Sequence, residues 1–137
     1  MGKQYSYAEL TRKVIGCAMD VHDFLGNGFQ EVIYQKALAL DMENQKIGFA
    51  REFEMHVMYK NHQVGTRRVD FLVEENASVA CKALNHLEKV HMAQVINYLE
   101  AYNLEVGLLI NFDATRLEFH RFQNKKFKPH RVNLKHP

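Results

Sequence analysis

The fold is decided by residues 64–84, VGTRRVDFLVEENASVACKAL, in which two apolar stretches are joined by a short polar turn. The first stretch predicts a strand over residues 64–74, and the second predicts another strand over residues 78–84. One charged residue interrupts the apolar segment of each predicted strand, namely Asp70 within residues 69–73 and Lys82 within residues 79–84. Because a buried charge is costly without a partner, these two residues are the first candidates for a functional site.

Two helices and a strand are expected before this stretch. In residues 7–25 apolar side chains recur at helical spacing, and the glycines that follow are typical of a helix end. A second helix is expected over residues 29–46. Its apolar stripe consists of Ile33, Ala37 and Leu40. Residues 51–59 then alternate between apolar and polar side chains, which predicts a strand with one face exposed to water.

A helix and two strands are expected after it. Residues 89–102 favour a helix, residues 105–112 form a nearly continuous apolar run, and residues 116–122 predict a last strand. The order ααβββαββ predicts an α/β fold with a mixed central sheet flanked by helices. A right-handed crossover joins the third and fourth strands. We expect one domain over residues 1–124, followed by a basic tail over residues 125–137.

Composition excludes several classes of protein. The chain has 137 residues, of which 47% are hydrophobic and 25% charged, so it is long enough to bury a core of its own. No apolar run approaches the roughly 18 residues that a membrane span needs, so we expect no membrane partner. Cys17 and Cys81 lie among apolar neighbours and outside any zinc-type spacing, which predicts free thiols and a cytoplasmic location.

The net charge of +2 does not by itself require a polyanionic partner. Its distribution is uneven, because no acidic residue follows Glu118. The expected tail contains Lys125, Lys126 and Lys128. These lysines would either contact the phosphates of a nucleic acid or belong to a solvated chain end, and the sequence leaves both open.

Lys82 has two explanations. On an edge strand its ammonium group would reach water, whereas in a buried strand it would need a carboxylate, a phosphate or a lowered pKa. Antiparallel pairing of the two strands would bring Asp70 and Lys82 onto one face, which Arg68 shares by alternation. Such a pair would be a structural salt bridge, or a site in which Asp70 binds a divalent cation and Lys82 acts on a water molecule.

Other polar residues fall at positions that could face a cleft. Glu31 lies in the first turn of the second helix, where the helix dipole alone favours a carboxylate. Tyr34 follows at i+3 and shares its face. On the later helix, His91, Gln94 and Tyr98 form a polar stripe that faces either solvent or a cleft.

Residues 28–34 read Gly-Phe-Gln-Glu-Val-Ile-Tyr and resemble the signature of the small GxxExxY proteins, a branch of the PD-(D/E)XK nuclease-like superfamily. Residues 15–22, 94–99 and 106–112 also resemble that family, in the correct order. The resemblance extends from about Val14 to Phe119. It implies a three-layer core of the restriction-endonuclease type.

The resemblance also implies roles for individual residues. Asp70 would be a metal ligand, Glu31 a second or outer ligand, Lys82 the catalytic lysine, and Gln94 would position a water molecule or a phosphate. The implied cofactor is Mg²⁺ or Mn²⁺, the implied substrate is DNA or RNA, and the implied reaction is phosphodiester hydrolysis.

The chain departs from the superfamily at one position. An acidic residue is expected two positions before the lysine, but the sequence has Ala80-Cys81-Lys82. Because Mg²⁺ is usually held by one or two carboxylates, we expect weak metal binding and impaired or absent cleavage. A domain that binds nucleic acid or protein without catalysis is the alternative. The sequence also leaves a homo-oligomer open.

Overall fold

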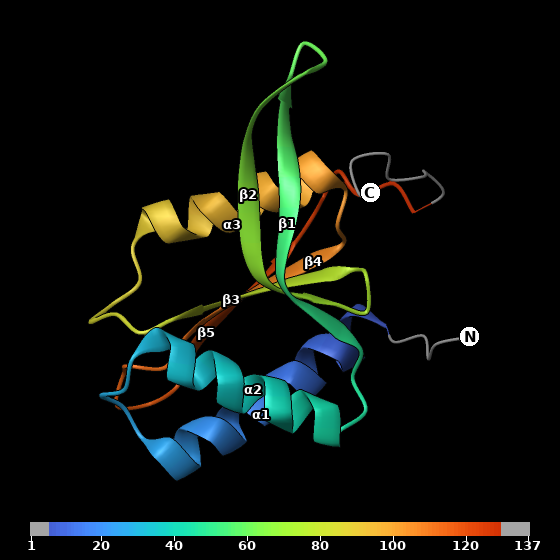
Figure 1. The fold of residues 1–137 in the computed structure, drawn as a ribbon. Helices are drawn as coiled ribbons and strands as arrows, with labels where there is room; N and C mark the ends of the chain where they lie inside the picture. The colour runs from blue at the N-terminus through green and yellow to red at the C-terminus, as the bar shows by residue number, and fades with distance from the viewer. Residues whose placement is uncertain (1–5, 130–137) are drawn as a thin grey trace.

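The computed structural model describes residues 6–129, and its elements follow the predicted order ααβββαββ (Figure 1). They are α1 (Tyr7–Leu25), α2 (Glu31–Asn44), β1 (Phe49–Tyr59), β2 (His62–Val73), β3 (Ala77–Lys82), α3 (Lys89–Tyr102), β4 (Val106–Asn111) and β5 (Glu118–Gln123). Residues 1–5 lie outside the described residues, and so do residues 130–137 of the predicted tail.

The five strands form one mixed sheet in chain order, β1-β2-β3-β4-β5. Only β3 and β4 are parallel, and α3 connects them. Helices α1 and α2 lie on one side of the sheet and α3 lies on the other (Figure 1). The predicted three-layer α/β architecture is therefore confirmed.

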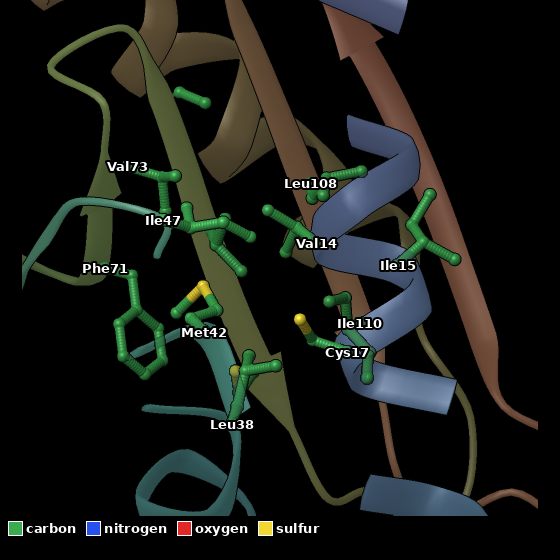
Figure 2. Packing of buried hydrophobic residues seen from close by; sticks show 14 of the residues in the cluster. Val14, Ile15, Cys17, Leu38, Met42, Ile47, Phe71, Val73, Leu108 and Ile110 are labelled. Atoms are coloured by element: carbon green, nitrogen blue, oxygen red, sulfur yellow. The ribbon is translucent and has the colours of Figure 1, made fainter. Parts of the chain in front are cut away.

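Alternation along the strands divides the core into two clusters. Phe71 and Val79 pack toward α1 and α2, whereas Leu72 packs toward α3. Figure 2 shows the first cluster, in which Met42 of α2 lies near Phe71. Both side chains have no exposed surface. Burial of one such side chain stabilises the fold by about 1.5–3 kcal/mol.

Of the three residues in the predicted apolar stripe of α2, only Ala37 packs against the core. Ile33 and Leu40 are 37% and 63% exposed, whereas Tyr34, Leu38 and Met42 are fully buried. Apolar residues lie around most of this helix, so periodicity allows more than one buried face. The side that faces the sheet is set by how the preceding loop is attached, which is a tertiary property.

Strand β2 is paired with β1 along most of its length but with β3 at only three positions, Phe71 to Val73. Before Phe71, β2 therefore leaves β3 while remaining paired with β1. The resulting β1–β2 hairpin runs past α3 and continues beyond it (Figure 1). The hydroxyl of Tyr102 on α3 donates a 2.8 Å hydrogen bond to the carbonyl oxygen of His56 in this hairpin.

Candidate nuclease-like site

A pocket opens on the α3 side of the sheet, where β2 leaves β3. Its lining comes from β2, β3, β4 and α3, and consists of Arg67, Arg68, Val69, Asp70, Ser78, Ala80, Lys82, His91, Gln94, Val95, Tyr98 and Leu109. The pocket contains about 510 Å³ of empty space, which includes space open to solvent. Most of the residues selected from the sequence are therefore brought together by the fold.

Strand β3 loses its backbone pairing with β2 where β2 bends away. The side chain of Asp70 supplies a hydrogen bond to β3 in its place. Its Oδ2 atom accepts a 2.7 Å hydrogen bond from the backbone N–H of Cys81. Burial raises the pKa of the Asp70 carboxyl above its usual value, and the N–H of Cys81 and the charge of Lys82 oppose this shift. The Asp70 carboxylate therefore accepts a backbone hydrogen bond and is at the same time partly removed from water.

Glu31 reaches the same segment from α2. Its carboxylate accepts a hydrogen bond from the backbone N–H of Ala83. Burial raises the pKa of the Glu31 carboxyl, the charge of Lys82 lowers it, and the charge of Asp70 raises it. Glu31 and Asp70 therefore bind the backbone on either side of Lys82. Within residues 6–129 neither carboxylate makes a direct ion pair with Lys82.

The loop before α2 presents Glu31 to this segment. Gly28 has φ of 103°, a conformation that glycine adopts without strain, and its N–H donates to Oδ1 of Asp113 at 3.0 Å. The hydroxyl of Tyr34 donates to the carbonyl oxygen of Gly26 at 2.6 Å and accepts the N–H of Phe29 at 3.2 Å. This loop is held from both sides, so the start of α2 is held in place.

Tyr34 does not face the pocket, which corrects the sequence-based expectation. Its side chain is fully buried, and its ring stacks on Phe112 with centroids 4.7 Å apart. Its helical spacing from Glu31 does place both side chains on adjoining surfaces of α2. The difference is that Glu31 is the first residue of α2 and lies near the backbone of Ala83, whereas Tyr34 packs in the core.

The polar stripe of α3 lines the pocket. Gln94 is exposed, whereas Tyr98 is buried and its hydroxyl has no hydrogen-bond partner among the described residues. Burial raises the pKa of this hydroxyl. His91 accepts the backbone N–H of Glu88 through Nδ1 at 2.9 Å, so one of its ring nitrogens caps the helix. Tyr98 therefore places a polar group without a partner among the described residues in the wall of the pocket.

Two adjacent arginines of β2 line the pocket, although only one was predicted to do so. Arg68 lies 3.9 Å from Glu52 in an ion pair whose side chains are both exposed. Arg67 is the residue that strand alternation assigned to the other face. Because β2 twists as it leaves β3, strict alternation fails here. The only sequence signal for Arg67 was its position next to Arg68.

The lysines of the predicted tail lie away from the pocket. Lys126 forms an ion pair with Glu100 at 3.6 Å, and the N–H of Lys128 donates to Oδ1 of Asn103 at 3.0 Å. Glu100 and Asn103 lie at the C-terminal end of α3, whereas the pocket is lined by residues 91–98 of that helix. The third lysine, Lys125, is exposed.

The described residues offer few carboxylate ligands for the Mg²⁺ ion that the superfamily resemblance implies. Asp70 and Glu31 are the carboxylates nearest to Lys82, and the third acidic position is occupied by the methyl group of Ala80 in the pocket wall. Among residues 6–129 no group of three or more histidine, cysteine or acidic side chains is arranged to hold a metal ion. Mg²⁺ requires near-octahedral oxygen coordination, so two carboxylates leave most positions to water.

Comparisons with known proteins bear on the fold and the family of the chain. The chain is similar in fold to a solved structure titled "Crystal structure of SSO0001", with a TM-score of 0.54 and 15% sequence identity. The match covers 67% of this chain and 48% of that one, so the chain spans less than half the length of that protein. A search of curated proteins found no match. No helix within residues 6–129 has the length and apolar character needed to cross a bilayer.

A family model described as the PD-(D/E)XK nuclease superfamily matches residues 8–122. That range includes every strand of the sheet except the last residue of β5, and all three helices except the first residue of α1. It also includes Asp70 and Lys82. The chain therefore belongs to the PD-(D/E)XK nuclease superfamily.

Proposed function

We propose that this domain derives from metal-dependent nucleases and that its own phosphodiester hydrolysis is impaired or absent because of Ala80. The observation that carries the proposal is the position of Ala80. It lines the pocket together with Asp70 and Lys82, at the point where the superfamily places an acidic ligand. The remaining pocket residues suit binding of a phosphodiester, because cations and neutral hydrogen-bond donors dominate the lining.

Each pocket residue has a task in this proposal. Lys82 contacts the phosphate or the attacking water, and its charge is kept in place by the two carboxylates that bind the adjacent backbone. Arg67 and Arg68 hold phosphate oxygens, and Gln94 orients the reacting group by its amide. Members of the superfamily generally use a divalent metal, which neutralises developing charge and activates water.

Restoring the missing carboxylate tests the proposal. Ala80→Glu should raise the rate of DNA or RNA cleavage in Mg²⁺ or Mn²⁺ by about tenfold or more, because a tenfold gain needs only about 1.4 kcal/mol of transition-state stabilisation. Ala80→Gln is the matched control, because it adds the same bulk without the charge. The gain should vanish in the double variant that also carries Lys82→Met.

Single-stranded and double-stranded substrates of both nucleic acids are needed. Thermal unfolding should first show that each variant is folded. If a folded Ala80→Glu protein cleaves none of these substrates faster than Ala80→Gln does, the site is not a nuclease site disabled at Ala80.

Binding without catalysis is a second candidate, and the charge of the pocket favours it. Arg67, Arg68 and Lys82 face a single lining carboxylate, that of Asp70. Such a pocket attracts phosphate without a metal ion. Binding of an oligonucleotide should then persist in EDTA, weaken as salt rises, and weaken further in Lys82→Gln. Binding that does not change with salt would contradict it.

A further inference from the structure

The β1–β2 hairpin ends in a ribbon that pairs with no third strand within residues 6–129. We call residues 57–65 the arm tip. Every residue of the arm tip is exposed, and its strands pair only with each other. The last described attachment before it is the hydrogen bond from Tyr102 to His56. Figure 1 shows the ribbon continuing away from the sheet beyond α3.

Apolar side chains are exposed on the arm tip, which is unusual for a part of a protein without a partner. Met58 is 48% exposed, and Tyr59 and Val64 are each 61% exposed. A two-stranded hairpin without a packed face is marginally stable in water. Its turn also carries strain, because Lys60 and Asn61 have φ of 48° and 67°. A free end of this kind indicates a surface that is used for contact.

The charge of the hairpin identifies the class of partner. Residues 55–69 contain no aspartate or glutamate, but contain Lys60, Arg67 and Arg68 and two histidines. Arg67 and Arg68 line the pocket at the base of the hairpin, where Glu52 and Glu54 of β1 lie across from Arg68, and Lys60 adds a cation at the tip. At the tip the ammonium group of Lys60 lies 5.3 Å from the ring centroid of Tyr59.

The geometry points to the arm tip as a second contact for the nucleic-acid strand bound in the pocket. Lys60 contacts a phosphate and Tyr59 offers its exposed ring to a base, while the pocket holds the phosphodiester near Lys82. β-ribbons enter nucleic-acid grooves, and aromatic rings stack on unpaired bases. This inference rests on the proposed function, because it assumes that the pocket binds nucleic acid.

A turn redesign separates binding from folding. The double variant Lys60→Asn, Asn61→Gly keeps φ positive at both positions and installs the turn pair that tight hairpins favour. The hairpin should remain at least as stable, because Asn and Gly relieve the strain, while one phosphate contact is lost. The affinity for a fluorescein-labelled mixed-sequence oligonucleotide, measured by anisotropy in EDTA, should fall about threefold to tenfold. The salt slope should fall by about one.

Lys46→Asn is the matched control. Lys46 is an exposed lysine with φ of 60°, and it follows α2, which lies on the side of the sheet opposite the pocket. The variant removes the same charge at a similar backbone conformation, so binding should be unchanged. Tyr59→Ala should weaken binding of the single strand about fivefold or more, and binding of the same sequence as a duplex by less.

The outcomes separate the two proposals. If Lys82→Gln weakens binding while both arm-tip variants bind as the wild type does, the arm-tip inference is overturned and the pocket remains a nucleic-acid site. If Lys46→Asn loses as much affinity as the turn variant, the contact is nonspecific and the inference is also overturned. If Tyr59→Ala dissolves a dimer in sedimentation and leaves binding unchanged, the partner of the tip is a second copy. If no oligonucleotide binds and Ala80→Glu does not cleave, the proposed function itself fails.

Discussion

Asp70 and Glu31 each satisfy one backbone N–H of the segment that carries Lys82. Burial raises the pKa of each carboxyl, and a neighbouring carboxylate adds to each shift, Asp70 for Glu31 and Glu52 for Asp70. If the two side chains served only to accept these backbone hydrogen bonds, an uncharged amide oxygen would do so at either position. The arrangement is therefore typical of a site in which part of the stability is given up for binding or chemistry.

This crowding predicts a pH dependence of stability. Because the folded state has the raised pKa, it holds these protons more tightly than the unfolded chain does. Stability therefore falls as the pH rises from the unfolded-state pKa through the folded-state pKa. Asp70→Asn and Glu31→Gln keep an acceptor oxygen but remove the charge, so each should reduce this fall and raise the melting temperature at neutral pH. Thermal unfolding across this pH range measures the effect.

Glu43→Gln is the control, because Glu43 is an exposed carboxyl elsewhere on α2. It should follow the wild-type profile. If Asp70→Asn and Glu31→Gln instead lower the melting temperature at every pH, both carboxylates are structural groups, and the case for a binding site is weakened.

Single residues were predictable from the sequence where their chemistry conflicted with their surroundings. Asp70 and Lys82 interrupt apolar strands, and both line the pocket. Tyr34 gave no such conflict, since a tyrosine on a helix suits a core as well as a cleft. Ala80 is visible in the sequence only because the superfamily motif expects an acid there.

The segment between α1 and α2 shows how an element is shaped for the site. Gly28 requires a positive φ, and its N–H bonds Asp113 in the connection between β4 and β5. The hydroxyl of Tyr34 forms hydrogen bonds with the backbone of Gly26 and Phe29 in the same loop. The spacing of Gly28, Glu31 and Tyr34 thus follows from one structural task, which is to place the Glu31 carboxylate at the backbone of β3.

Two glycine substitutions should therefore change stability in opposite directions. Gly28→Ala places a side chain at φ of 103° and should lower the free energy of unfolding by about 1 kcal/mol or more. Gly16→Ala lies within α1, where an added Cβ meets no atom within 4 Å, and should raise it by about 0.5–1 kcal/mol. Urea unfolding measures both. A gain at position 28 would contradict this account of the loop, and a loss at position 16 would contradict this account of α1.

At the scale of the whole molecule, the central strands and the hairpin differ in support. Strands β3 and β4 are joined by continuous parallel pairing from Ala77 to Lys82, and all residues of β4 are buried. In the β1–β2 hairpin, buried residues occur only near the base, where Met55 packs in the cluster formed with α3. The molecule therefore consists of a rigid three-layer body and a ribbon that projects from it (Figure 1).

Hydrogen exchange should report this difference. We expect the amides of β4 to exchange most slowly, because they open only with global unfolding, and those of residues 57–65 to exchange fastest among the strands. Exchange monitored by mass spectrometry, with and without a bound oligonucleotide, measures both. Protection of residues 57–65 equal to that of β4 in the isolated protein would mean that the hairpin already has a partner.

The sequence by itself determined the order of the elements and the residues that do not fit an apolar strand. Both are local properties, because periodicity and turn chemistry act over a few residues. The face that α2 buries, the inward position of Tyr34, the pocket at the bend of β2 and the inclusion of Arg67 were decided only by the tertiary structure. They depend on which surfaces meet after the chain has folded, and residues far apart in the sequence set that geometry.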